Sequence, residues 1–396
     1  MNRDFYKKIE SLVDPKKKPP VIESGQGAYL TINGRKTLNF CSSHYLGFAV
    51  EPRLRTAAKR AIDKYGMGTG YRTLVGTHIL HVKLEKAIAH YKGAEAAIVL
   101  TGGYMANCAA IQTIIGKEDI VISDALNHAS IIDAVRLSGV RNKFIYKHLD
   151  MNDLEAKLKE AGKLAKTPKS DGEKPLTLIV TDGVFSMDGD LAPLPAIVKL
   201  AKKYGALTMV DDAHGEGVVG RGRGIVSHFG ISGQVDIEVG TLSKAFSVMG
   251  GFITGKRELI AFYKQRARQF LFSNALTIPD TAALLEAVTI LQKSDALVAK
   301  LWKNTKLLKD ELAAAGFDIG KSETPITPIM LGDEKIAFDF ARELLKERVM
   351  ASAIVFPMVA KGKARVRIIP SASHSARDIK FGIEKIKKVG KKLRVI

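Results

Sequence analysis

A lysine directly after a short buried segment could supply a nucleophilic amine. Residues 237–240 have the β-branched pattern of a strand, and Thr241 and Lys244 follow it at once. A lysine in such a place is most often a solvated side chain. Here, however, residues 245–251 are apolar and rich in glycine, and a lysine kept from water has a lowered pKa. Lys244 is therefore expected to act as a nucleophile or as a Schiff-base amine.

A carboxylate and an imidazole lie three residues apart at the end of another expected strand, 206–210. Asp211 and His214 could form a catalytic pair, bind a metal or cap the strand. A metal site would need a third ligand close by, and only Glu216 offers one, so no metal is expected. Alternatively, Asp211 could hold the protonated nitrogen of a heterocycle, while His214 reaches the oxygen beside it.

Two glycines between a strand and a helix could form an anion site. Gly102 and Gly103, followed by Tyr104, allow backbone N–H groups to face an anion at the helix N-terminus. His128 also begins a helix, where a histidine is more often a cap or a packing residue. The glycines at 66–70 follow a helix rather than a strand, which argues against a dinucleotide site. Pyridoxal phosphate (PLP) fits this set, because it is a phosphorylated, protonatable ring that a lysine can hold covalently.

The elements that must position these residues alternate between strands and helices. The expected strands are 96–101, 119–123, 143–147, 177–181, 206–210, 237–240 and 251–254. The expected helices between them include 104–115, 130–137, 152–161 and 196–204. This alternation predicts an α/β fold with helices on both faces of a mostly parallel sheet. Binding sites in such sheets lie at the carboxyl ends of the strands, so the residues above are expected to meet there.

Together with the segments before and after these strands and helices, the sequence indicates that the chain has three parts. An N-terminal arm and hairpin are expected over 1–50, a large PLP-binding α/β domain over 51–279 and a smaller C-terminal α+β domain over 280–396. Within them, the sequence predicts a hairpin around Gly34 and a helix over 52–65. The last part is expected to contain a long helical stretch, three short strands and a final helix, at 280–315, 326–331, 351–355, 365–369 and 375–392.

Composition excludes several classes of protein. Of the 396 residues, 46% are hydrophobic and 26% charged, which is typical of a globular chain. No apolar run is long enough for a membrane span, and no signal peptide is recognisable. The two cysteines, Cys41 and Cys108, favour a reducing cytoplasm.

The net charge of +20 raises the question of a nucleic-acid partner. Half of the excess lies in residues 361–396, with 12 lysines and arginines against 2 acids. Much of it falls on the helix expected at 375–392, where Ile379, Ile383 and Ile386 form an apolar stripe opposite a solvated face. No nucleic-acid motif accompanies the charge, so no nucleic-acid partner is expected. A basic surface would also attract a polyanion such as coenzyme A.

Short motifs along nearly the whole chain resemble those of the α-oxoamine synthases. They include Tyr-Leu-Gly at 45–47, Asp-Asp-Ala-His-Gly at 211–215 and Thr-x-Ser-Lys at 241–244. Further matching segments are 72–85, 103–107, 128–130, 185–190, 272–274 and 364–367. These enzymes are fold-type-I PLP-dependent transferases, aspartate aminotransferase-like in fold, that join an amino acid to an acyl-CoA. The resemblance therefore implies a cytoplasmic acyltransferase that uses PLP.

The resemblance implies catalytic roles for four residues. Lys244 would form the Schiff base and later move the α-proton of the substrate. His128 would stack on the ring and neighbour the substrate, Asp211 would keep the ring nitrogen protonated, and His214 would bond the ring hydroxyl oxygen.

The resemblance also implies binding residues and a homodimer with shared active sites. Arg367 would grip the substrate carboxylate, and His44 replaces an asparagine that neighbours the substrates in the family. The residues implied in binding the cofactor phosphate or its surroundings are Gly103, Tyr104, Ser186 and Thr241, together with Ser273 and Asn274 from the second subunit.

The choice of substrates is less defined than the chemistry. Residues 356–367 resemble glycine C-acetyltransferase (2-amino-3-ketobutyrate CoA ligase) most, which favours glycine and acetyl-CoA. The alternatives within the family are 8-amino-7-oxononanoate synthase of biotin biosynthesis, 5-aminolevulinate synthase and serine palmitoyltransferase. The alternative from a different class of enzyme is a PLP-dependent aldolase or aminotransferase with the same fold.

Overall fold

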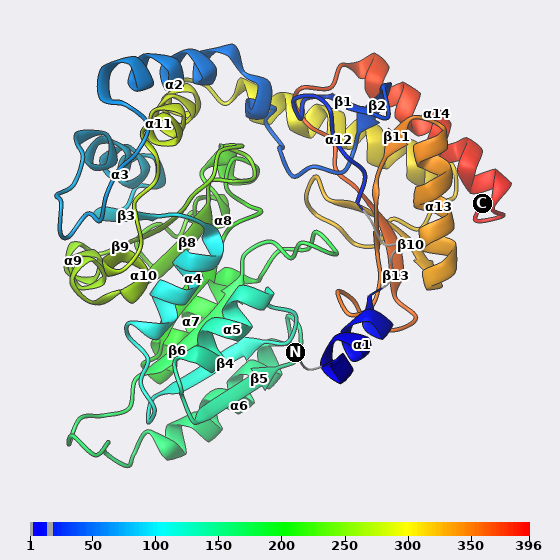
Figure 1. The fold of residues 1–396 in the computed structure, drawn as a ribbon. Helices are drawn as coiled ribbons and strands as arrows, with labels where there is room; N and C mark the ends of the chain where they lie inside the picture. The colour runs from blue at the N-terminus through cyan, green and yellow to red at the C-terminus, as the bar shows by residue number, and fades with distance from the viewer. Residues whose placement is uncertain (1–2, 14–18) are drawn as a thin grey trace.

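The larger body of the molecule is built on a seven-stranded sheet (Figure 1). The structure is a computed structural model that describes residues 3–13 and 19–396. The strand order is β3–β9–β8–β7–β6–β4–β5, and β9 alone of these seven runs antiparallel to its neighbours. The strands are β3 (Ala96–Leu100), β4 (Ile120–Asp124), β5 (Asn142–Tyr146), β6 (Thr177–Asp182), β7 (Leu207–Asp211), β8 (Ile237–Thr241) and β9 (Gly251–Gly255). All seven confirm the sequence-based expectation to within one residue at either end, as does the α/β class.

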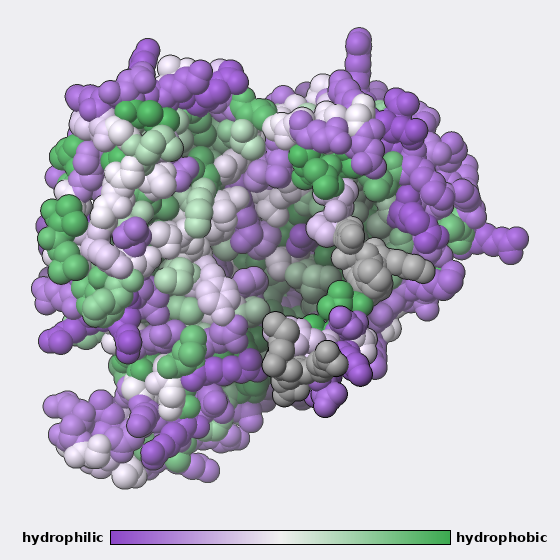
Figure 2. Space-filling model, viewed as in Figure 1, coloured by the Kyte–Doolittle hydropathy of each residue, from purple (hydrophilic) through white to green (hydrophobic). Residues whose placement is uncertain are grey.

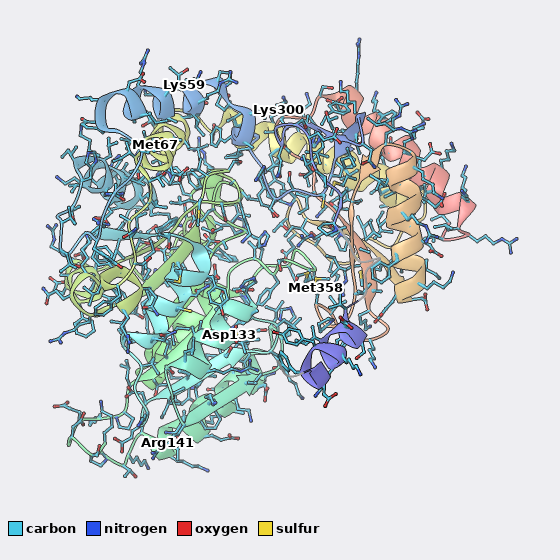
Figure 3. The ribbon with its side chains drawn as sticks, viewed as in Figure 1. Lys59, Met67, Asp133, Arg141, Lys300 and Met358 are labelled. Atoms are coloured by element: carbon cyan, nitrogen blue, oxygen red, sulfur yellow. The ribbon has the colours of Figure 1, made fainter. Side chains whose placement is uncertain are left out.

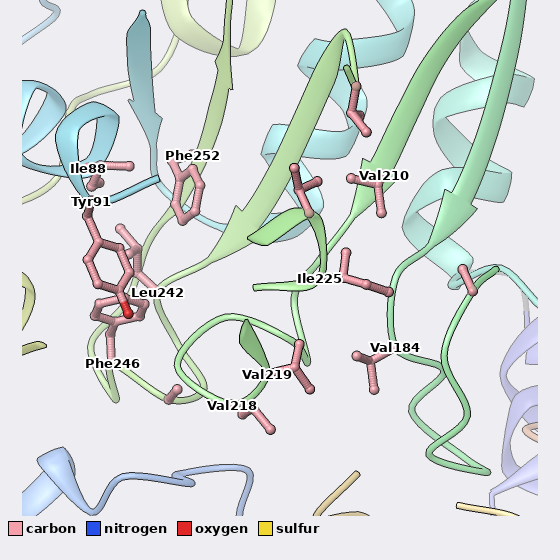
Figure 4. Close-up of a cluster of buried hydrophobic side chains, with 14 of the residues drawn as sticks. Ile88, Tyr91, Val184, Val210, Val218, Val219, Ile225, Leu242, Phe246 and Phe252 are labelled. Atoms are coloured by element: carbon pink, nitrogen blue, oxygen red, sulfur yellow. The ribbon is translucent and has the colours of Figure 1, made fainter. Parts of the chain in front are cut away.

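Helices cover both faces of this sheet because its strands are apolar on both sides. Consecutive strand residues point to opposite faces, so Ile98 packs in one core and Val99 in the other. The Val99 core, part of which is drawn in Figure 4, also contains Val210 and Phe252. The helices on the Ile98 side are α4 (Gly103–Gln112), α5 (Ala129–Leu137), α9 (Arg257–Arg266) and α10 (Arg268–Leu271). Those on the other side include α3 (Ile79–Lys92), α6 (Met151–Leu164), α7 (Leu194–Tyr204), α8 (Ile225–His228) and α11 (Ile278–Lys293).

Two three-stranded sheets form a second, smaller body with its own core. Leu38 and Phe40 of the N-terminal segment pack there with Phe340 and Val366, so the hairpin lies against the C-terminal region. The sheets have the orders β1–β2–β11 and β10–β13–β12. Their strands are β1 (Tyr29–Ile32), β2 (Arg35–Asn39), β10 (Thr327–Gly332), β11 (Val349–Met350), β12 (Ser352–Ile354) and β13 (Ala364–Ile368). Three helices complete this core: α12 (Ala296–Ala314), α13 (Glu334–Lys346) and α14 (Ala376–Lys392).

The basic C-terminal helix α14 has the amphipathic form that its sequence predicts. Ile379, Ile383 and Ile386 are buried in the smaller core. The helix starts with a capping box, in which Ser375 accepts a hydrogen bond from the Asp378 amide and Asp378 accepts one from the Ser375 amide. Four of its lysines, at 380, 388, 391 and 392, are exposed, whereas Lys385 and Lys387 are partly buried.

The expectation of one helical stretch over 280–315 is wrong. Helix α11 ends at Lys293 and α12 begins at Ala296, because Ser294 adopts an extended conformation. Helix α11 packs against α2 (Pro52–Tyr65) and α3. Helix α4 is also shorter than the expected 104–115. No expectation covered α1 (Arg3–Leu12), α3, α8, α10, α13 or β11. The structure also has the short helices η1 (Phe48–Val50) and η2 (Gly220–Gly222).

Within residues 3–13 and 19–396, no helix combines the length and the apolar character that crossing a membrane requires. The division into parts at residues 50 and 279 stays a prediction.

Candidate active site

A pocket of about 200 Å³ lies at the carboxyl ends of the sheet strands. Lys244, Asp211, His214 and His128 all line it, although they lie at or just after the ends of three different strands. The parallel direction of β4, β7 and β8 brings these strand ends to one edge of the sheet. The strand-end rule therefore predicted correctly where these four residues meet.

Lys244 lies in the loop after β8, and its carbonyl accepts hydrogen bonds from the amide and the hydroxyl of Ser247. Burial lowers the pKa of Lys244, and the nearby carboxylates of Asp211 and Asp182 oppose this effect only in part. A lowered pKa makes the neutral, nucleophilic amine more accessible at neutral pH.

Two N–H donors hold the carboxylate of Asp211. Asn107 Nδ2 donates to Oδ2 at 2.6 Å, and the Ala213 amide donates to Oδ1 at 3.0 Å. The same Asn107 amide group donates to Ser130 Oγ at 2.8 Å, and Ser130 Oγ lies 2.7 Å from His128 Nδ1. A continuous polar network thus connects His128 to Asp211 across the pocket.

His128 is both a helix cap and a pocket residue. As the N-cap of α5, its Nδ1 accepts from the Ser130 amide at 3.2 Å. Burial lowers the pKa of His128, with the Asp211 charge opposing it and the Lys244 charge adding to it. The capping interpretation is therefore confirmed, and the cap fixes the ring at the pocket wall, whereas the catalytic role of His128 stays a prediction.

A neutral His214 is oriented by a residue far away in the sequence. Tyr45 OH lies 2.8 Å from His214 Nδ1, and both side chains are buried. Burial lowers the pKa of His214 well below its ordinary value, and the positive charges of Lys244 and Arg367 lower it further. Burial also raises the pKa of Tyr45, so its hydroxyl keeps its proton and donates to Nδ1. The proton of the neutral ring is then on Nε2, which can donate to a ligand oxygen.

Sequence reasoning missed one acid in the pocket, Asp182. It is the last residue of β6 and stands opposite Asp211 in the register of β6 and β7. Burial, and then the charge of Asp211, raise the pKa of Asp182 well above its ordinary range. Its Oδ2 accepts from the His128 amide at 3.2 Å. The strand-end rule could have found this residue, since Asp182 directly follows the strand expected at 177–181.

The other end of the pocket can hold an anion. Helix α4 begins at Gly103, and its N-cap, Gly102, provides no side-chain acceptor, so the first amides of the helix face the pocket unpaired by a cap. A Cβ at Gly103 would lie 3.0 Å from the Thr241 side chain, so a larger residue there would have to push Thr241 aside. Thr241 Oγ1 and Ser243 Oγ lie 2.8 Å apart at the same place. Helix amides with two hydroxyl groups are a suitable site for a phosphate.

The two arginines of β13 have different partners. Arg365 forms an ion pair with Asp188 and donates to the carbonyls of Met187 and Lys363. Arg367 donates only from Nη1, to the Ser186 carbonyl at 2.8 Å, and its buried Nε has no partner in the part of the chain that the structure describes. Arg367 therefore keeps donors for a carboxylate, whereas Arg365 is already occupied.

Four expected residues, Ser273, Asn274, His44 and Arg367, are not among those that line this pocket, although Arg367 donates to the carbonyl of Ser186, which does line it. Ser273 and Asn274 lie in an exposed loop after α10. His44 is partly buried, and burial lowers its pKa. Glu216, the one candidate for a further metal ligand, instead forms an ion pair with the buried Lys92 at 2.6 Å. Among the described residues, no three histidines, cysteines or acids come together as a metal site.

The pocket fits PLP. Two buried oxygens on its wall, Asn107 Oδ1 and Asp182 Oδ1, have no hydrogen-bond partner among the described residues, as expected where a polar ligand binds. The anion site lies at one end of the pocket, and Lys244, Asp211 and His214 line the rest of it.

Fold and site together define a PLP-dependent transferase of fold type I. A family model described as aminotransferase class I and II matches residues 35–386. Two relatives named 8-amino-7-oxononanoate synthase, from Fervidobacterium nodosum and Thermosipho melanesiensis, are each 57% identical over 95% of this chain and 94% of their own. A serine palmitoyltransferase from S. paucimobilis, solved with a PLP adduct, has a TM-score of 0.89 at 31% identity over 100% of this chain and 97% of its own. The chain belongs to the aminotransferase class I and II family and, within it, to the α-oxoamine synthases.

Proposed function

We propose that this enzyme condenses alanine with the thioester of a seven-carbon dicarboxylic acid to give 8-amino-7-oxononanoate. The observation that carries the proposal is the 57% identity, over nearly the full length, to relatives with that name. The name describes a nine-carbon acid with a ketone at C7 and an amine at C8. Carbons 8 and 9 correspond to alanine without its carboxyl group, and carbons 1 to 7 to the diacid. The relatives thus support an alternative from the sequence analysis better than glycine with acetyl-CoA.

At the α-carbon of alanine, the reaction replaces the bond to the carboxyl group with a bond to the acyl group. The α-carbon of alanine loses its proton and forms a bond to the thioester carbonyl carbon, and the thiol leaves. The carboxyl group departs as carbon dioxide, and a proton returns to the α-carbon. Bound PLP supplies a protonated ring that accepts the electron pair released at the α-carbon.

The lowered pKa of Lys244 suits both of its proposed tasks. As a neutral amine, it would hold the cofactor covalently before the amino acid binds. Once displaced, the same amine would take the α-proton and later return it, which requires a base with a pKa near the working pH. Asp211, fixed by Asn107 and the Ala213 amide, would keep the proton on the ring nitrogen.

Three further residues would position the reactants. His214 would donate from Nε2 to the ring oxygen, since its Nδ1 is occupied by Tyr45. Arg367 would bind the alanine carboxylate through its free donors, because a guanidinium can make two parallel hydrogen bonds to a carboxylate. His128 would cover one face of the ring.

We further propose a cytoplasmic homodimer in which Ser273 and Asn274 complete the site of the partner subunit. Two exposed segments support this. Thr73 Oγ1 donates to the Leu271 carbonyl, so the segment with Leu74 lies beside the loop with Phe272. Leu74 is 81% and Phe272 72% exposed, and apolar side chains this accessible are typical of a surface that another protein covers.

A CoA-release assay tests the proposed function. Glycine, alanine and serine are each paired with acetyl-CoA, with the CoA thioester of heptanedioic acid and with palmitoyl-CoA. The highest kcat/KM is expected for alanine with the heptanedioic thioester. A clear preference for glycine with acetyl-CoA would contradict it and favour glycine C-acetyltransferase. Purified protein without a borohydride-reducible visible chromophore would contradict both.

A further inference from the structure

A second cavity adjoins the cofactor pocket. It has a volume of about 570 Å³, and Ser186 lines both spaces. One wall comes from the segment before α5 and the loop after β6, and the other from residues 356–360 and the start of β13. Figure 2 shows this face of the molecule hollowed between its two halves. In Figure 3 the labelled Met358, one of the lining residues, lies between the two bodies.

The walls of this groove expose large apolar side chains on both sides. Leu126 is 53%, Ile132 40%, Phe356 52% and Met358 50% exposed. All four line the same groove, although two come from the large sheet domain and two from the C-terminal body. Exposed apolar side chains that line one groove from both sides are typical of a ligand site. The expected ligand is an apolar chain rather than a polar head group.

The charges along the groove leave one cation without an ion pair. His148 lies 2.9 Å from both Asp124 and Asp190, so its charge is compensated. Arg365 is compensated by Asp188. Lys363 also lines the groove, and its ammonium group forms no ion pair with any residue that the structure describes.

We propose that this groove binds the acyl chain of the thioester substrate and that Lys363 binds a carboxylate at the far end of that chain. The inference rests on the proposed function and adds to it the residue that selects a dicarboxylic acyl group. Continuity with the cofactor pocket at Ser186 allows the thioester carbonyl to reach the reacting carbon while the chain lies along Leu126 and Met358. The polyphosphate of coenzyme A is a poor occupant, because both walls expose large apolar side chains and the two lining acids, Asp188 and Asp190, already pair with Arg365 and His148.

The test compares two thioesters of equal chain length, those of heptanedioic and heptanoic acid. Lys363→Met is expected to lower kcat/KM for the heptanedioic thioester about tenfold more than for the heptanoic one, equivalent to about 1.4 kcal/mol. Lys361→Met is the matched control. It removes an exposed lysine from the same loop, whose ammonium lies over the Phe356 ring at 5.4 Å, and it should leave the ratio unchanged.

Three outcomes would overturn the inference. Lys363→Met could lower kcat/KM equally for both thioesters, it could have the same effect as Lys361→Met, or it could have no effect. A binding measurement separates this inference from the proposed function. Calorimetry on the PLP-loaded enzyme without amino acid gives the dissociation constants of the two thioesters. If the binding preference depends on Lys363 but no CoA is released, the proposed function fails and the groove assignment holds. If CoA is released but the binding preference does not depend on Lys363, the proposed function holds and the groove assignment fails.

Discussion

Asn107 donates a hydrogen bond of 2.6 Å to Asp211, and the pair joins helix α4 to the end of strand β7 at the floor of the cofactor pocket. The same amide group also holds Ser130. Asp211 therefore has a fixed orientation before any ligand binds. An acceptor that is already oriented costs no reorganisation during the reaction, which is the condition for strong electrostatic stabilisation.

Asp211→Asn should retain PLP but lose turnover. The substitution keeps the shape and removes the charge that stabilises a protonated ring nitrogen, so kcat should fall on the order of 100-fold. Steady-state kinetics with the cofactor content measured by absorbance check this. Asp212→Asn is the control, because Asp212 accepts from the Ile225 amide and lies near Lys92 rather than in the pocket. That variant should lose stability rather than turnover per folded molecule. A rate for Asp211→Asn close to that of the parent would refute the role.

Lys244→Ala should abolish both turnover and the absorbance of covalently bound cofactor. The protein should remain folded, because the variant removes a buried amine whose burial already costs free energy. Absorbance spectra before and after borohydride, with circular dichroism for the fold, measure the two effects. Lys256→Ala, an exposed lysine at the N-cap of α9, should change neither. Substantial turnover in Lys244→Ala would contradict the assignment of Lys244 as the lysine that holds the cofactor.

Arg367→Ala should raise the KM for the amino acid strongly and leave that for the thioester nearly unchanged. Loss of a partly buried contact with a carboxylate should cost about 2–5 kcal/mol. Arg365→Ala should chiefly lower stability, since it breaks the ion pair with Asp188 and leaves the Met187 carbonyl without its donor. Substrate kinetics and urea unfolding of both variants separate the two effects. A larger amino-acid defect in Arg365→Ala would show that the roles are reversed.

Mixing two inactive variants should restore part of the activity if the sites are shared. A Lys244→Ala protomer and an Asn274→Ala protomer would form a hybrid dimer in which one site has both residues intact. Activity is measured after the variants are unfolded together and refolded, with each variant treated alone as the control. No recovery in hybrids shown to form, or fully active monomers on dilution, would contradict the shared-site prediction.

His148 should make stability fall at alkaline pH. Burial by itself would lower its pKa, but the hydrogen bonds and charges of Asp124 and Asp190 outweigh burial and raise the pKa to about 9. Because the folded pKa lies above the unfolded value of about 6.5, the stabilisation is complete below pH 6.5 and is lost as the pH rises through about 9. It should amount to about 1–3 kcal/mol.

The measurement is urea unfolding of the parent and of His148→Gln. At pH 6 the parent should be more stable by that amount, and near pH 10 the difference should largely vanish. A gap that is constant across this range would contradict the role of His148 as a charged bridge.

The strands and the first members of the site could be predicted from the sequence, because both are local. Apart from the edge strand β5, each strand of the large sheet is a short, mostly apolar run with polar or glycine residues near its end, and a parallel sheet places such ends at one edge. Lys244, Asp211 and His128 each lie within a few residues of a strand end. Their meeting in one pocket therefore follows from the order of elements alone.

Only the tertiary structure decided the partners of these residues. The Tyr45–His214 hydrogen bond, the position of Asp182 opposite Asp211 and the break after Lys293 depend on packing between segments far apart in the sequence.

The two arginines show the physical reason. Arg365 and Arg367 stand two residues apart on one strand, so the alternation of side chains puts both on the same face and cannot choose between them. What distinguishes them is a loop about 180 residues earlier in the chain, in which Asp188 neutralises Arg365 while the Ser186 carbonyl takes a single donor of Arg367. A local pattern sets where a side chain points, but its free hydrogen-bonding capacity depends on which distant groups the fold brings to it.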